Sequence, residues 1–96
     1  MDNSRARQIE VEKIAEVEFY GADCCGDCRR SKSLLNTLGV EYEMHDVEES
    51  KENADKAMEI AGRKNIPVIR FADGAFLVEP PDSVLHAELK VRGLVD

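Results

Sequence analysis

Apolar and polar residues alternate along several short runs of this chain, and stretches with helical spacing lie between those runs. Apolar residues at every second position predict a strand over 14–20 and another over 40–47. Between them, leucines recur at helical spacing from Asp27 to Leu38, and Gly39 is typical of a residue that follows a helix. These runs predict a strand, a helix and a second strand in succession.

The second half of the chain begins with another helix and a hairpin. Gly62 ends a pattern in which apolar residues recur at i, i+3, i+4 and i+7, namely Ala54, Ala57, Met58 and Ala61. Residues 67–71 and 75–78 indicate two short strands joined around Asp73-Gly74, a strong hairpin signal. We expect these two strands to pair antiparallel.

A last helix follows Pro80-Pro81-Asp82, which we expect to interrupt the sheet and to cap that helix. Its predicted buried positions are Val84, Leu85, Leu89 and Val91. The element order is then β-α-β-α-β-β-α. A helical crossover makes the first two strands parallel, so the pattern predicts an α/β fold with a four-stranded mixed sheet flanked by helices on both faces.

The 96 residues are enough for one hydrophobic core, which we place in a domain over 13–96. Residues 1–12 are mostly polar, with Ile9 and Val11 as the large apolar residues after Met1, and are expected to form a disordered leader. The formal net charge of -7 argues against nucleic acid and anionic membranes as partners. No signal peptide or membrane span is evident, and we expect a monomer located in the cytoplasm.

Candidate chemistry is concentrated in Cys24-Cys25-Gly26-Asp27-Cys28, between the first strand and the first helix. A C-x-x-C spacing on the first helical turn brings two sulfurs close enough to form a disulfide reversibly. The helix N-terminus favours a thiolate on Cys25, which makes it the expected nucleophile, while Cys28 is the expected resolving thiol. Gly26 is expected to allow a tight bend, and the charge of Asp27 opposes the thiolate.

The same cysteines have other possible uses. A C-x-x-C pair is also half of a zinc knuckle, and Cys24 offers a third sulfur, but the chain has no second cysteine pair and its two histidines are isolated. Redox use is therefore preferred. A module that binds an iron-sulfur cluster or a metal is the alternative function, inert thiols are a further possibility, and no metal ligands are assigned. For Cys24 itself, a small hydrophobic role is preferred to a regulatory or metal-binding one.

With these motifs in place, the sequence resembles the glutaredoxin family of the thioredoxin fold over about 17–91. The resemblance rests on Phe19-Tyr20, Cys25-Gly26-Asp27-Cys28, Asp46-Val47-Glu48, Ile66-Pro67-Val68 and Phe71-Ala72-Asp73-Gly74. The hairpin followed by Pro80 is more similar to the mycoredoxins of actinobacteria. This resemblance implies a thiol-disulfide oxidoreductase that reduces protein disulfides or mixed disulfides, without a tightly bound cofactor, and is recharged by a low-molecular-weight thiol or a flavoprotein.

The resemblance also implies that the Ile66-Pro67 bond is cis and that the Ile66 backbone pairs with an incoming thiol peptide. Arg29 and Arg30 are candidates for neutralising a substrate carboxylate, and a solvated helix face is equally expected for Arg30. Where glutathione-using members carry a basic residue and a Gly-Gly pair, this chain has Ala22 and Glu79-Pro80. We therefore expect mycothiol, or a flavoprotein, to be preferred to glutathione. The pocket expected to accept mycothiol is formed by Ile66, Pro67, Phe71 and the Asp82 end of the last helix.

Overall fold

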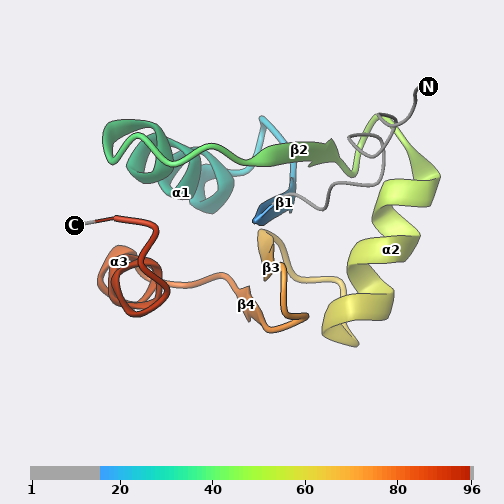
Figure 1. Cartoon of the computed structure of the whole chain (residues 1–96). Coiled ribbons are helices and arrows are strands. Elements are labelled where there is room, and N and C mark those ends of the chain that lie inside the picture. Colours follow the sequence, from blue (N-terminus) through green and yellow to red (C-terminus); the bar gives the residue numbers. More distant parts are fainter. Residues whose placement is uncertain (1–15, 96) are drawn as a thin grey trace, which may run out of the picture.

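The computed structural model describes residues 16–95, and the predicted leader over 1–12 lies outside them. The described elements follow the predicted order (Figure 1). They are β1 (Val17–Gly21), α1 (Gly26–Thr37), β2 (Glu43–Asp46), α2 (Lys51–Ala61), β3 (Val68–Phe71), β4 (Phe76–Val78) and α3 (Asp82–Val91). None of the helices in this part of the chain has the length and apolar character needed to cross a bilayer.

The four strands form one mixed sheet in the order β2-β1-β3-β4. The crossover through α1 makes β1 and β2 parallel, whereas β1 and β3 are antiparallel, with Val17 opposite Phe71 and Tyr20 opposite Val68. The strands β3 and β4 form the predicted hairpin, in which the Gly74 N–H donates to the Phe71 carbonyl at 2.9 Å. The predicted fold class is therefore confirmed.

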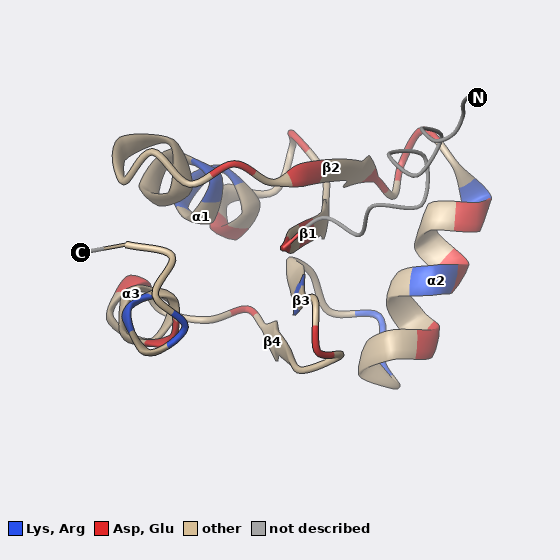
Figure 2. Ribbon diagram, in the orientation of Figure 1, with Lys and Arg blue, Asp and Glu red and all other residues tan. Residues whose placement is uncertain are grey.

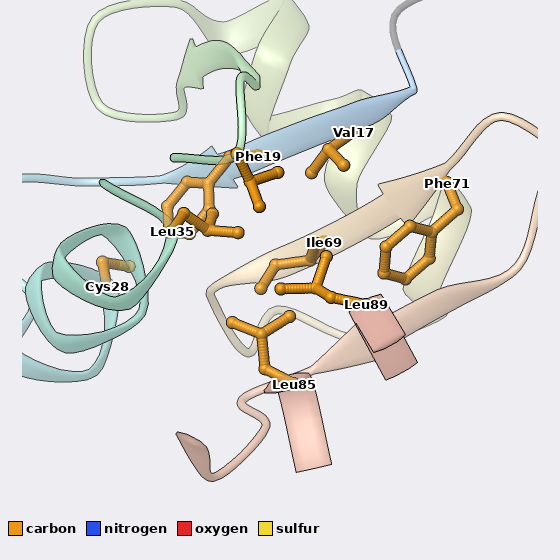
Figure 3. Close-up of a cluster of buried hydrophobic side chains, with 9 residues drawn as sticks. Val17, Phe19, Cys28, Leu35, Ile69, Phe71, Leu85 and Leu89 are labelled. Carbon is orange, nitrogen blue, oxygen red and sulfur yellow. The ribbon is translucent and has the colours of Figure 1, made fainter. Parts of the chain in front are cut away.

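Helices cover both faces of the sheet, with α1 and α3 on one side and α2 on the other (Figure 1). The larger core lies under α1 and α3, where Cys28 and Leu35 of α1 and Leu85 and Leu89 of α3 point toward Phe19 and Ile69 of the sheet (Figure 3). The smaller core lies under α2 and contains Tyr20, Ala57 and Val68. Alternation along β1 explains the two cores, because successive side chains point to opposite faces.

Local sequence explains where α2 begins and ends. Ser50 caps its N-terminus, since Oγ accepts a hydrogen bond from the Asn53 N–H at 3.3 Å. Gly62 ends the helix in the left-handed region, at φ 76°. The last helix differs from the prediction, because Asp82 does not cap it. Pro81 holds the cap position without a side-chain hydrogen bond, and Asp82 is the first helical residue.

Two predicted buried positions are exposed, because Val84 and Val91 retain 45% and 83% of their accessible surface. Met58, which belongs to the apolar pattern of α2, retains 44%. The reason on α3 is geometric: Leu85 and Leu89, four residues apart, form the stripe that packs, and the valines lie outside it. The second strand is also shorter than predicted, because the Val40 N–H donates to the Leu35 carbonyl in the turn that closes α1.

Candidate redox site

The two cysteines of the C-x-x-C motif lie where the chain leaves β1 and enters α1. Cys25 is the N-cap of α1, with extended backbone, and its Sγ accepts a hydrogen bond from the Cys28 N–H at 3.3 Å. Its thiol is partly exposed, whereas Cys28 is fully buried. The predicted nucleophile is therefore the accessible sulfur, at a helix N-terminus whose N–H groups stabilise negative charge.

The Cys28 sulfur has a different environment. It lies within the larger core, and the Ala22 N–H donates a hydrogen bond to it at 3.4 Å. Burial is the main cause that raises the pKa of Cys28, from 9.0 to about 12, and the sulfur of Cys25 adds to the increase. Near neutral pH, Cys28 is accordingly a protonated thiol one helical turn from an accessible one.

Gly21 is a site residue that the sequence analysis missed. A Cβ added there would lie 2.6 Å from Cε1 of Phe19 and 2.8 Å from Sγ of Cys28, both inside van der Waals contact. The last position of β1 must therefore lack a side chain for the Cys28 sulfur to pack against the sheet. A glycine that ends a strand of alternating apolar residues just before a C-x-x-C motif is the signal that could have revealed it.

Gly26, in contrast, does not play the role predicted for it. It is exposed, its φ is not positive, and the nearest atom to an added Cβ is an Arg29 nitrogen at 4.0 Å. The backbone here is already the first turn of α1, so no special conformation is required. The tight bend occurs earlier, where the Cys25 N–H donates to the Ala22 carbonyl at 3.2 Å.

The charged residues around the motif pair with one another. Arg30 contacts Asp27 at 2.9 Å and Asp82 at 3.4 Å, and so connects α1 to the start of α3. Arg29 is exposed and donates to the Asp23 carbonyl at 2.9 Å, while Lys32 pairs with the Asp23 carboxylate at 2.7 Å. Asp23 and Asp27 thus each have a cation beside them, so the charge of Asp27, which was expected to oppose a thiolate, is partly neutralised.

The Ile66-Pro67 peptide bond is cis, as the resemblance implied. Pro67 is buried, and its carbonyl accepts a hydrogen bond from the Glu79 N–H at 2.9 Å. Ile66 is partly buried and packs against the larger core, as Cys25 does. Since Val68 pairs with Tyr20, the residues before Val68 lie beside the loop that follows β1. The structure therefore brings Ile66 and Pro67 to the edge of the sheet that carries the cysteines.

Phe71 does not belong to this pocket, contrary to the prediction. It is paired with Val17 at the start of β1, while the cysteines follow the end of β1. Figure 3 shows Phe71 and Cys28 at opposite ends of the larger core. Because β3 is antiparallel to β1, each residue after Pro67 leads away from the redox loop.

Cys24 is exposed and its thiol has a polar partner, so the small hydrophobic role preferred for it is wrong. Its thiol donates a hydrogen bond to Oε2 of Glu48 at 3.0 Å, and that bond is the main cause that raises the pKa of Cys24. The zinc-knuckle alternative gains no third ligand from it. Among residues 16–95, the grouped metal-ligating side chains are Glu18, Glu43 and His45, which include no cysteine.

The fold consists of a βαβ unit followed, after a helix, by a hairpin. Its site has an accessible thiol at a helix N-terminus, a buried thiol behind it and a cis-proline beside them. Together these features define a thiol-disulfide oxidoreductase of the thioredoxin fold. A sequence model of the Glutaredoxin family matches residues 17–77. The chain belongs to the glutaredoxin family.

The relatives agree with this assignment. A Mycobacterium tuberculosis (strain H37Rv) protein named as a glutaredoxin is 30% identical over 81 residues, which are 82% of this chain and 96% of that protein. Glutaredoxin 3 of Escherichia coli K12 is 30% identical over 83 residues, covering 86% and 95% of the two chains. The crystal structure of an Archaeoglobus fulgidus glutaredoxin has a TM-score of 0.69 at 24% identity and covers 86% of this chain and 94% of that one.

Proposed function

We propose that this protein reduces protein disulfides and mixed disulfides through Cys25 and Cys28. The Cys25 thiolate attacks one sulfur of the substrate disulfide, and the other substrate sulfur leaves as a thiolate and takes up a proton. Cys28 then loses its proton and attacks the Cys25 sulfur, which releases the second substrate thiol. Two electrons pass to the substrate, and the protein is left with a Cys25-Cys28 disulfide.

The observation that carries this proposal is the contrast between the two sulfurs. Cys25 is accessible at the N-terminus of α1, whereas Cys28 is buried, with its pKa raised to about 12. A buried, protonated thiol does not compete for incoming disulfides. It becomes an effective nucleophile only against a sulfur held beside it, which is the situation in the Cys25 mixed disulfide.

The proposal also covers substrate binding at the same edge of the sheet. The backbone of Ile66, beside Pro67, pairs with the substrate peptide, and the N-terminus of α1 at Gly26 faces the sulfur under attack. Arg29 is exposed near the loop and supplies a positive charge for a substrate carboxylate. Asp82 acts by holding Arg30, and therefore shapes the boundary of the site between α1 and α3.

Two molecules of a low-molecular-weight thiol restore the dithiol. The first forms a mixed disulfide with Cys25, and the second releases it as a small disulfide. We propose mycothiol in preference to glutathione, because the buried Ala22 stands where glutathione-using relatives carry a basic residue, and Glu79-Pro80 stands in place of their glycine pair. The test is the rate of reduction of the oxidised protein by mycothiol, glutathione or a flavoprotein reductase at matched concentration. A glutathione rate above the other two would reject the subgroup assignment.

The dithiol mechanism itself is tested with two serine variants. Cys25→Ser should abolish reduction of every disulfide, whereas Cys28→Ser should still exchange with small mixed disulfides and lose most turnover on protein disulfides. Equal losses in both variants on both substrates would contradict the division of roles.

We also place the protein in the cytoplasm, where a reducing environment keeps such thiols available.

A further inference from the structure

A pocket of about 230 Å³ lies between α2 and the loop that leads into β3. Five of its lining residues are apolar: Val47, Ala54, Ala57, Met58 and Ile66. The remaining lining side chains, Asp55, Arg63 and Lys64, are exposed and form its rim. Pockets for whole cofactors and drug-sized ligands are generally larger, about 300–1,000 Å³, so this volume suits one or two amino-acid side chains.

The position of the pocket relates it to the redox site. Ile66 lines the pocket and directly precedes the cis-proline. Val47 also lines the pocket, and its N–H donates to the carbonyl of Gly21 at 3.0 Å, at the end of β1. The next residue, Glu48, accepts the hydrogen bond of Cys24. The pocket therefore opens beside the loop that carries Cys25.

The charge around the pocket differs from the charge of the chain as a whole. The chain carries -7, yet Arg63 and Lys64 lie together in the segment between α2 and β3, which Figure 2 shows in blue. Within residues 16–95 neither of them forms an ion pair, whereas Asp55 on the same rim is paired with Lys51 at 2.9 Å. An apolar hollow beside two cations is complementary to an aliphatic side chain with a carboxylate nearby.

We propose that this pocket binds a large aliphatic side chain of the protein substrate, at the residue next to the cysteine under attack, with an acidic residue close by. This inference rests on the proposed function. Cys25 packs against the core on the α1 side, whereas the pocket is lined by α2. Successive side chains of an extended peptide point to opposite faces, so a substrate that presents its cysteine to Cys25 presents the adjacent side chain to the pocket.

The backbone of Ile66 is available for this pairing. Val68 is the first residue of β3 paired with β1, and within the described chain no backbone hydrogen bond is made by the N–H or carbonyl of Ile66. A peptide strand that pairs with Ile66 therefore extends the surface that the pocket belongs to. Backbone pairing supplies general affinity, and the pocket supplies the preference among substrates.

The experiment uses short peptides in which one cysteine is disulfide-bonded to 2-mercaptoethanol, with Leu or Ala on either side of it and Glu or Gln one residue further on. The release of peptide thiol is followed in a single turnover with the reduced full-length protein, so that no reductant enters the measurement. With the varied residue either before or after the cysteine, but not both, we expect the Leu peptide to react about tenfold faster than the Ala peptide. A tenfold ratio corresponds to a free-energy difference of about 1.4 kcal/mol. We expect Glu to exceed Gln by a smaller factor that falls with salt.

The ratio of Leu to Ala rates, compared within each variant, tests the pocket. Ala54→Leu fills it and should bring the ratio close to one. Lys56→Leu adds the same side chain to an exposed position of α2 outside the pocket and should preserve the ratio. Arg63→Gln with Lys64→Gln should remove the Glu preference, and Lys56→Gln should not.

Distinct results would overturn the proposal. Equal Leu and Ala rates in the wild-type protein would show that the pocket does not bind a substrate side chain. A preference for the Leu peptide that persists in Ala54→Leu would show the same. Slower recharging by a small thiol in Ala54→Leu, with the peptide ratio intact, would assign the pocket to the reductant instead. If Ala54→Leu fails to fold, Met58→Ala, which enlarges the pocket at a half-exposed position, should shift the preference toward larger side chains. A protein that reduces no peptide and no small disulfide would instead contradict the proposed function.

Discussion

The backbone N–H of Ala22 donates a hydrogen bond to the sulfur of Cys28 at 3.4 Å, which joins the end of β1 to the first turn of α1. Although this bond favours the thiolate, burial has the larger effect and raises the pKa of Cys28 from 9.0 to about 12. Unfolding exposes the thiol and returns its pKa to the ordinary value. The folded protein therefore holds the Cys28 proton more tightly than the unfolded chain does.

Stability should consequently depend on alkaline pH through Cys28. A raised folded-state pKa contributes stability in full below the ordinary value, and this contribution is lost as the pH rises from about 9 toward about 12. Three pKa units correspond to at most about 4 kcal/mol. Urea unfolding under reducing conditions should show a steeper alkaline loss in the wild-type protein than in Cys28→Ala. Parallel pH profiles would show that the thiol is not desolvated.

Gly21 should be far less tolerant of a side chain than Gly26. Gly21→Ala forces a Cβ against Phe19 and Cys28, and overpacking of this kind costs about 1–3 kcal/mol. Gly26→Ala is the matched control, because an added Cβ there has space and alanine favours the helix by up to about 1 kcal/mol. Chemical denaturation of both variants is the measurement. Similar stabilities would mean that the sheet and α1 are not in contact at this point.

The ion pair between Arg30 and Asp82 should contribute only modestly to stability. Both side chains are about half exposed, at 46% and 49%, and exposed pairs of this kind contribute about 0.2–1 kcal/mol. A double-mutant cycle with Arg30→Gln and Asp82→Asn should give a coupling energy in that range, which decreases at high salt. A coupling energy of zero at low salt would show that the two helices are not linked in this way.

Glu48 should control the reactivity of Cys24. The carboxylate accepts the thiol hydrogen bond and so raises the pKa of Cys24. Glu48→Gln removes the negative charge, and Cys24 should then react faster with iodoacetamide below its pKa. The rates are measured in a Cys25→Ser, Cys28→Ser background, so that only one thiol reacts. Glu49→Gln, the exposed neighbouring carboxylate, should leave the rate unchanged.

The sequence was sufficient for the order of the elements. Alternation identified β1, and Gly39, Gly62 and Asp73-Gly74 marked the ends of helices and the hairpin, because each position requires a backbone that glycine adopts easily. The C-x-x-C motif located the redox loop, because the spacing of its two cysteines is also a local property of the sequence. Information of this kind depends on neighbours along the chain, and it carries over to the folded protein.

Contacts between distant segments could not be predicted in the same way. Arg30 and Asp82 are far apart in the sequence, and nothing in either segment shows that α1 and α3 meet there. Phe71 was misplaced because its distance from the cysteines depends on the antiparallel register of β3. Val84 and Val91 were assigned to the core from hydrophobicity alone, although α3 contacts the sheet through a narrow stripe. The pocket beside Ile66 likewise arises only when α2 packs against the sheet.

The contact between Gly21 and the Cys28 sulfur has a thermodynamic consequence. The sulfur that takes part in the proposed redox chemistry is also a packing atom between the sheet and α1. Oxidation and folding are therefore linked in one thermodynamic cycle, whose four states are the folded and unfolded chain, each reduced or oxidised. Any mutation that disturbs this contact in one redox state more than in the other must change the reduction potential by the same free energy. For a two-electron couple, about 30 mV corresponds to about 1.4 kcal/mol. A substitution at Gly21 that strains the two redox states unequally would therefore change the oxidising strength of the protein.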